Sequence, residues 1–165
     1  MHKILFLLCP TDCLESIIND MFGEDVFFYS SLGNSMTLKM NTLECIKKLI
    51  IEYQIEEVSF VLSTNNDIFK DAIGKENFID IFGLRNIYSQ IHKEKSNSEL
   101  FWPSDLNFAS LISYYLNTKI KELQMVFEQF KEVSVEISGR IYDRHDNSFK
   151  KIYHDLVCVK RHYLN

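Results

Sequence analysis

The chain has 165 residues, of which 46% are hydrophobic and 25% charged, and its net charge is −5. This length suits one domain, residues 1–165, with a substantial buried core. The negative charge argues against a nucleic-acid partner, because a protein that binds the phosphate backbone needs a basic face. We interpret the local basic residues as solvated strand ends: Lys150, Lys151, Lys160 and Arg161.

Cysteine usage and hydropathy favour a cytoplasmic protein with no membrane partner. The four cysteines, at positions 9, 13, 45 and 158, form no CxxC pair and no disulfide framework. The apolar run Ile4–Leu8 is shorter than the ~7–15 residues of a signal-sequence core. No run approaches the ~18–20 apolar residues of a membrane helix.

The first half of the chain predicts two strands and two helices. Lys3–Cys9 reads as a buried strand that Pro10 ends, and Thr11 or Asp12 can cap a short helix over residues 13–22. Val26–Ser30 is rich in β-formers and predicts a second strand. A second helix is expected from Thr42, because apolar residues recur at helical spacing: Leu43, Ile46, Leu49, Ile50 and Tyr53.

The segment Glu57–Asp67 (EVSFVLSTNND) predicts the central strand and the loop that carries any site. Its apolar run, 58–62, is typical of a parallel strand buried on both faces. Ligands of open α/β sheets bind at the carboxyl ends of the strands. The polar residues from Ser63 onward are therefore expected at the functional edge.

The second half predicts helices followed by two strands. A helical segment is expected over Ile68–Ile73, a less regular one over 78–97 with an exposed polar stretch at 93–99, and a long helix over Leu106–Phe130. Residues 133–142 alternate as a strand does, and Phe149–Val159 can return as an antiparallel edge strand. The fold class is three-layer α/β, with a mainly parallel sheet of about four strands flanked by helices.

Four segments, in order and at consistent spacing, resemble motifs of the β-class carbonic anhydrases. They are CPTDC after the first strand, GEDVFFYSSLGN, EEVSFVLSTNND and VSVEISGRIYDRHDNSFKKI. The most specific piece is Gly139–Asp143 (GRIYD) followed by Asn147 and Phe149. The resemblance covers most of the chain, from Met1 to Tyr153. It implies the anhydrase fold and a homodimer.

The resemblance also implies where zinc would be held. The family's Cys, His and Cys ligands fall on Cys9, Ser63 and Asn66, and its Asp–Arg pair falls on Thr11 and Cys13. Asp12 lies one place from the family's aspartate. A serine hydroxyl and a neutral amide are not zinc ligands. We therefore expect no metal, no cofactor and no catalytic residue: a protein of the anhydrase kind that has lost carbon dioxide hydration.

Two alternatives stay open. Zinc could be held at a rebuilt site by Cys9, Cys13, His154 and Cys158, although residues four apart on a strand lie about 13 Å from each other. The chain would then be an active anhydrase; a hydrolase-like activity that uses other residues is the second enzymatic alternative. Without zinc, the protein acts as an interaction module, or the polar residues at the strand ends form a pocket for a small anion or polar metabolite. In the purely structural case, these residues only hydrogen-bond to one another and to solvent. The pocket candidates are Cys9, Thr11, Asp12, Cys13, Ser63 and Asn66.

Overall fold

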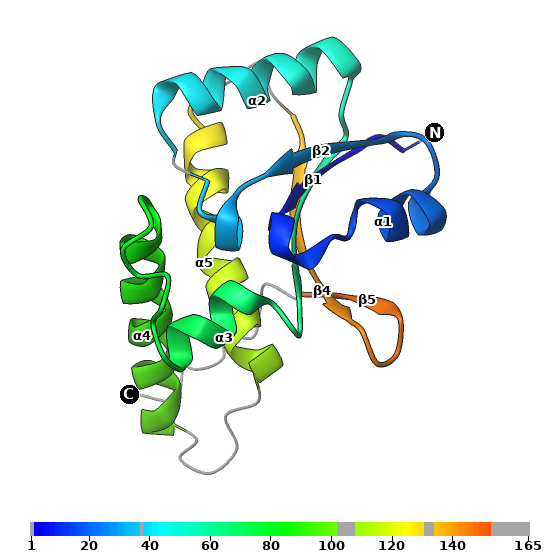
Figure 1. Ribbon diagram of the computed structural model, residues 1–165. Coiled ribbons are helices and arrows are strands. Elements are labelled where there is room, and N and C mark those ends of the chain that lie inside the picture. Colours follow the sequence, from blue (N-terminus) through cyan, green and yellow to red (C-terminus); the bar gives the residue numbers. More distant parts are fainter. Residues whose placement is uncertain (1, 37, 102–107, 131–133, 153–165) are drawn as a thin grey trace.

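The computed structural model describes residues 2–36, 38–101, 108–130 and 134–152. These residues form one five-stranded sheet in the order β2-β1-β3-β4-β5 (Figure 1). The strands are β1 (Ile4–Leu8), β2 (Val26–Ser30), β3 (Glu57–Ser63), β4 (Glu136–Asp143) and β5 (Ser148–Lys151). Strands β2, β1, β3 and β4 pair in parallel, and only β5 is antiparallel. The predicted fold class is confirmed.

The two central strands are buried on both faces, as their continuous apolar sequences predict. Every residue of β1 and of β3 is buried. Leu7 pairs with Phe60 in the last register pair between them. Both strands therefore end at the same edge of the sheet, so the polar residues that follow them lie close together.

Helices cover both faces of the sheet. Helix α1 (Glu15–Phe22) packs on one face through Ile18, beside Leu14, in a cluster with Phe6 and Val61. The other helices lie on the opposite side of the sheet from α1 (Figure 1), and that face carries the larger core. Residues of four helices contribute to that core: α2 (Met40–Tyr53), α3 (Asp67–Ile73), α4 (Leu84–Phe101) and α5 (Phe108–Phe127). None of the described helices is long and apolar enough to cross a membrane.

An ion pair is buried on the α1 side of the sheet. Arg140 Nη1 lies 2.7 Å from Glu57 Oε1, and their side chains are 12% and 4% exposed. Ser138 donates to the same oxygen, and the Arg140 guanidinium lies over the Phe6 ring. Burial alone would raise the pKa of Glu57, but hydrogen bonds from Arg140, Ser138 and His2 lower it to about 2.

Helix boundaries differ from those predicted. Residues 10–12 form a 3₁₀ turn, Cys13 is left-handed, and α1 begins after Leu14, so neither Thr11 nor Asp12 caps it. Helix α2 begins at Met40 rather than at Thr42. Small shifts of this kind are common, because end residues gain little from the helix itself.

The largest difference is α4, which is one continuous helix where a less regular segment was predicted. Its buried residues Leu84, Ile87, Tyr88 and Ile91 recur at three and four. The Tyr88 hydroxyl donates to Asp71 Oδ2 at 2.5 Å, which ties α4 to α3. Tertiary packing of this stripe thus outweighs the weak helical preference of the polar residues beyond it.

The C-terminal prediction is only partly covered by the described residues. Strand β5 ends at Lys151, and the rest of the expected strand, 153–159, lies outside them, as do Lys160 and Arg161. Lys150 pairs with Asp143 and Asp146, and Lys151 pairs with Glu136. The described lysines of the basic group are therefore exposed but matched by carboxylates.

Candidate functional site

The candidate site is the β1–β3 corner, defined by Cys9, Thr11, Asp12, Gly33, Asn34, Ser63 and Asn66. Strand β1 ends at Leu8, and Pro10 turns the chain away from the sheet. Strand β3 continues to Ser63, whose polar successors lead into α3. Beyond the end of β1, the backbone groups on this edge of β3 are therefore hydrogen-bonded by side chains instead of by a neighbouring strand.

Cys9 is the buried thiol of the corner. Its Sγ accepts a hydrogen bond from Gly33 N–H at 3.1 Å and lies 3.1 Å from Thr11 Oγ1. Gly33 has φ of +59°, and a Cβ on it would lie 3.1 Å from the Ile68 side chain. A glycine therefore suits this position for both backbone and steric reasons. In this conformation the Gly33 N–H points at the Cys9 sulfur.

Ser63 and Asn66 are both fully buried, and both serve the start of α3. Asn66 is the N-cap, and its Oδ1 accepts from Phe69 N–H at 3.0 Å. Ser63 Oγ accepts from Asn65 N–H at 3.1 Å. The Asn66 amide also donates to Thr11 Oγ1 at 3.5 Å, which links α3 to the turn after β1.

Asp12 and Asn34 take the place of β1 along the end of β3. Asn34 Nδ2 donates to the Val61 carbonyl at 2.8 Å, and Asp12 Oδ2 accepts from Ser63 N–H at 2.9 Å. A neighbouring parallel strand would fill these two positions with its own N–H and C=O. Two side chains from distant turns thus satisfy the backbone of β3 after β1 has left.

The carboxyl group of Asp12 is only 1% exposed, and its pKa is raised to about 6. Burial is the main cause, because it penalises the charged form. Hydrogen bonds from Ser63 N–H and the Asn66 side chain, and the charge of Arg144, work in the opposite direction. Arg144 also donates to the backbone carbonyl of Asp12. The corner therefore holds one buried group that changes charge near neutral pH.

The structure brings together five of the six predicted pocket residues: Cys9, Thr11, Asp12, Ser63 and Asn66. Cys13 is the exception, because it is exposed and its Sγ donates to the Pro10 carbonyl, at 3.5 Å, rather than to a residue of the corner. That these residues bind a ligand stays a prediction. The motif GEDVFFYSSLGN contains Gly33 and Asn34, but sequence reasoning did not assign either residue to the site. Two adjacent residues suited to left-handed backbone were the available signal.

The described residues contain no group of three or more His, Cys, Asp or Glu placed to hold a metal ion. His154 and Cys158, which the rebuilt zinc site requires, lie outside the described residues.

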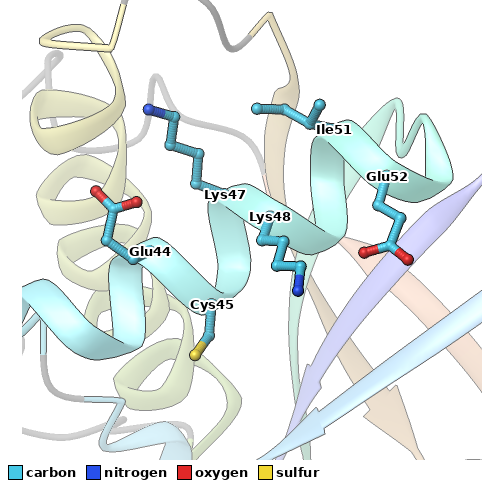
Figure 2. Close-up of a pocket in the computed structure, with 6 residues that line it drawn as sticks. All are labelled: Glu44, Cys45, Lys47, Lys48, Ile51 and Glu52. Carbon is cyan, nitrogen blue, oxygen red and sulfur yellow. The ribbon is translucent and has the colours of Figure 1, made fainter.

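A surface hollow of about 630 Å³ lies away from the corner, on the outer side of α2 (Figure 2). It is lined by Glu44, Cys45, Lys47, Lys48, Ile51 and Glu52. These side chains come from one helix and point in different directions, with Lys47 and Cys45 on opposite sides (Figure 2). A ligand site is typically enclosed and has polar groups that converge, and this hollow shows neither property.

Comparison with known proteins identifies the fold. No family model and no curated protein sequence matches the chain. Among solved structures, it resembles the β-carbonic anhydrase CafA of Aspergillus fumigatus, with a TM-score of 0.72, 19% identity, and coverage of 93% of this chain and 76% of that one.

Two further structures agree. CafD of the same fungus gives a TM-score of 0.73 at 14% identity, over 93% of this chain and 90% of that one. A tetrameric β-carbonic anhydrase from Sordaria macrospora gives 0.70 at 18% identity, over 92% and 80%. The chain therefore has the fold of the β-carbonic anhydrases. It is a carbonic-anhydrase-like protein in its architecture.

Proposed function

We propose that this protein keeps the carbonic-anhydrase fold but neither holds zinc nor hydrates carbon dioxide, and that the β1–β3 corner binds a small anion or polar metabolite. The observation that carries the proposal is the set of side chains that stand at the expected metal-ligand positions of the corner. The positions that the resemblance assigns to zinc hold one thiol, one hydroxyl and one neutral amide, at Cys9, Ser63 and Asn66.

The hydrogen bonds of these residues support the proposal. Zinc supplies a hydroxide at neutral pH by lowering the pKa of its bound water to about 7, and it needs three N, S or carboxylate ligands to stay bound. Here Ser63 Oγ and Asn66 Oδ1 each accept a backbone N–H at the start of α3. This donor set does not fit Zn²⁺, so no step of metal chemistry is assigned to it.

Zinc content tests the proposal directly. We expect well below one zinc per chain in protein purified without added metal, and no carbon dioxide hydration above buffer. A double variant, Ser63→His with Asn66→Cys, is expected to gain zinc, and adding Cys9→Ser should reduce that gain. Near-stoichiometric zinc in the unmodified protein would refute the proposal and favour the rebuilt-site alternative.

The ligand part of the proposal has a separate test. Thermal unfolding is measured with bicarbonate, phosphate, small carboxylates and small polar amines. A compound that binds only the folded state raises the melting temperature. If no compound of this panel changes it, the corner is a structural cluster and this part of the proposal fails.

We also propose that the protein is a cytoplasmic homodimer that uses β2. This strand forms one edge of the sheet, and its residues Val26–Tyr29 are all partly exposed. An apolar edge strand without charge or proline readily pairs with another chain. Cys9, Cys13 and Cys45 are free thiols, which suits a reducing compartment. Light scattering should give twice the 19.5 kDa chain mass, and Phe28→Lys should shift the protein to monomer.

A further inference from the structure

The β1–β3 corner contains a buried hydrogen-bond acceptor that the described residues leave without a donor. Asn34 is fully buried, and its Oδ1 has no hydrogen-bond partner among the described residues, although its Nδ2 is bonded to Val61. Most buried polar atoms in folded proteins are satisfied by protein, water or ligand. The carboxamide oxygen of Asn34 therefore requires a donor from outside this set of residues.

The residue that carries this oxygen binds β3 beside the residue that carries the buried carboxylate. The Val61 carbonyl, bound by Asn34, and the Ser63 N–H, bound by Asp12, belong to the two peptide bonds that flank Leu62. Both point toward the edge of β3 that β1 has left, whereas Thr64 N–H is bonded to Tyr142 on the β4 side. The carboxamide and the carboxylate are thus neighbours on one edge of one strand.

The charges around this edge favour a cation over an anion. Two neighbours influence the charge of Asp12 in opposite directions: Arg144 favours the ionised form, and Asp67 disfavours it. Both neighbours are exposed, whereas Asp12 is 1% exposed. The buried edge therefore carries about one negative charge when Asp12 is ionised, and an anion placed beside it would meet like charge in a poorly solvated setting.

Thr11 provides access and further acceptor atoms. It is only partly buried, unlike Cys9, Asp12, Asn34 and Asn66. Its Oγ1 lies between the Cys9 sulfur and the Asn66 amide. Thr11 Oγ1 and the Cys9 sulfur are thus further acceptor atoms in the corner, and Thr11 is its partly exposed member.

From this arrangement we propose that the β1–β3 corner binds a small cation that donates hydrogen bonds, of the ammonium class, held by Asn34 Oδ1 and the Asp12 carboxylate. The inference rests on the small-ligand part of the proposed function, and among those ligands it selects a free ammonium ion or the head group of a small primary amine rather than an anion. Each N–H of such a cation can meet one acceptor, which neither sodium nor a quaternary amine can do.

The test uses thermal unfolding of the full chain at pH 7.5, in the presence of a chelator. Ammonium chloride and methylammonium chloride are compared with sodium chloride and tetramethylammonium chloride at equal ionic strength. At ten times its dissociation constant, a bound ammonium should raise the melting temperature by about 3–6 °C over sodium. Titration calorimetry with ammonium chloride gives the same constant independently.

Three variants show whether the ammonium-induced rise in melting temperature depends on residues of the corner. Asp12→Asn removes the charge with little change of shape and should abolish the ammonium response. Thr11→Val removes one acceptor without changing charge and should weaken the response several-fold, which keeps the proposal testable if the first variant folds poorly. Asp20→Asn changes an exposed acid on α1 and should respond as the natural chain does.

The outcomes separate the inference from the proposed function. A response to ammonium that both corner variants reduce supports the inference. A response to bicarbonate or phosphate alone overturns it while leaving a small-ligand function in place. No difference between ammonium and sodium means that Asn34 is satisfied by an ordered water only, and it overturns the inference. Stoichiometric zinc refutes the proposed function instead.

Discussion

Removing the carboxylate of Asp12 should change the pH dependence of folding more than that of any surface acid. The group is buried, and its pKa in the folded protein is about 6, against a reference of 3.8. Asp12→Asn keeps the size of the side chain and an oxygen that can accept from Ser63 N–H. The variant therefore isolates the cost of the buried charge from the loss of the hydrogen bond.

The magnitude follows from the difference of about two pKa units, at about 1.4 kcal/mol per unit, or roughly 3 kcal/mol. Because the folded pKa is raised, the folded state binds the proton more tightly than the unfolded chain does. The stabilising contribution of the proton is complete below pH 3.8 and is lost as pH rises through about 6. The natural chain should therefore lose about 3 kcal/mol of unfolding free energy from this group between pH 4 and pH 7.

Urea denaturation at pH 4.5, 5.5, 6.5 and 7.5 measures this effect. The quantity of interest is the difference in unfolding free energy between the natural chain and Asp12→Asn, because other groups titrate in both. Glu57 is one of them, since its lowered pKa makes its own contribution disappear toward acid pH. The difference should move in favour of the variant as pH rises, and Asp20→Asn should show no such trend. Parallel profiles for the two chains would refute the reasoning.

Three further substitutions test the packing of the site and sheet by urea denaturation. Gly33→Ala should cost about 1–2 kcal/mol, because it combines a φ of +59° with a close contact, whereas Gly23→Ala, at +88° in open space, should cost less; equal costs would contradict the steric argument. Glu57→Gln should cost about 3–5 kcal/mol, because it leaves the Arg140 charge buried without its partner; a cost below 1 kcal/mol would show that water reaches the pair. Asn66→Ala should cost about 1 kcal/mol through loss of the α3 cap, and an unchanged stability would remove that role.

The sheet was predictable because its signal is local. The apolar runs at Ile4–Leu8 and within Glu57–Ser63 are long enough to indicate strands buried on both faces, and both are. The identities of Ser63 and Asn66 are read directly from the sequence, and the expectation that they do not hold zinc rests on those identities. Helix α4 was harder, because its buried stripe is short and its polar half gives no periodic signal.

What the sequence determined by itself is the layered fold and the presence of Ser63 and Asn66, side chains that are not zinc ligands, at the end of β3. What only the tertiary structure decided is the role of Asp12 and Asn34. By sequence, Asp12 was a helix cap or a slipped counterpart of the family's aspartate. In the fold it bonds to a residue 51 positions away, and Asn34 bonds to one 27 positions away. The local sequence pattern cannot reveal such partners. They depend on where β1 ends and on which backbone groups of β3 then lack a hydrogen bond from a neighbouring strand.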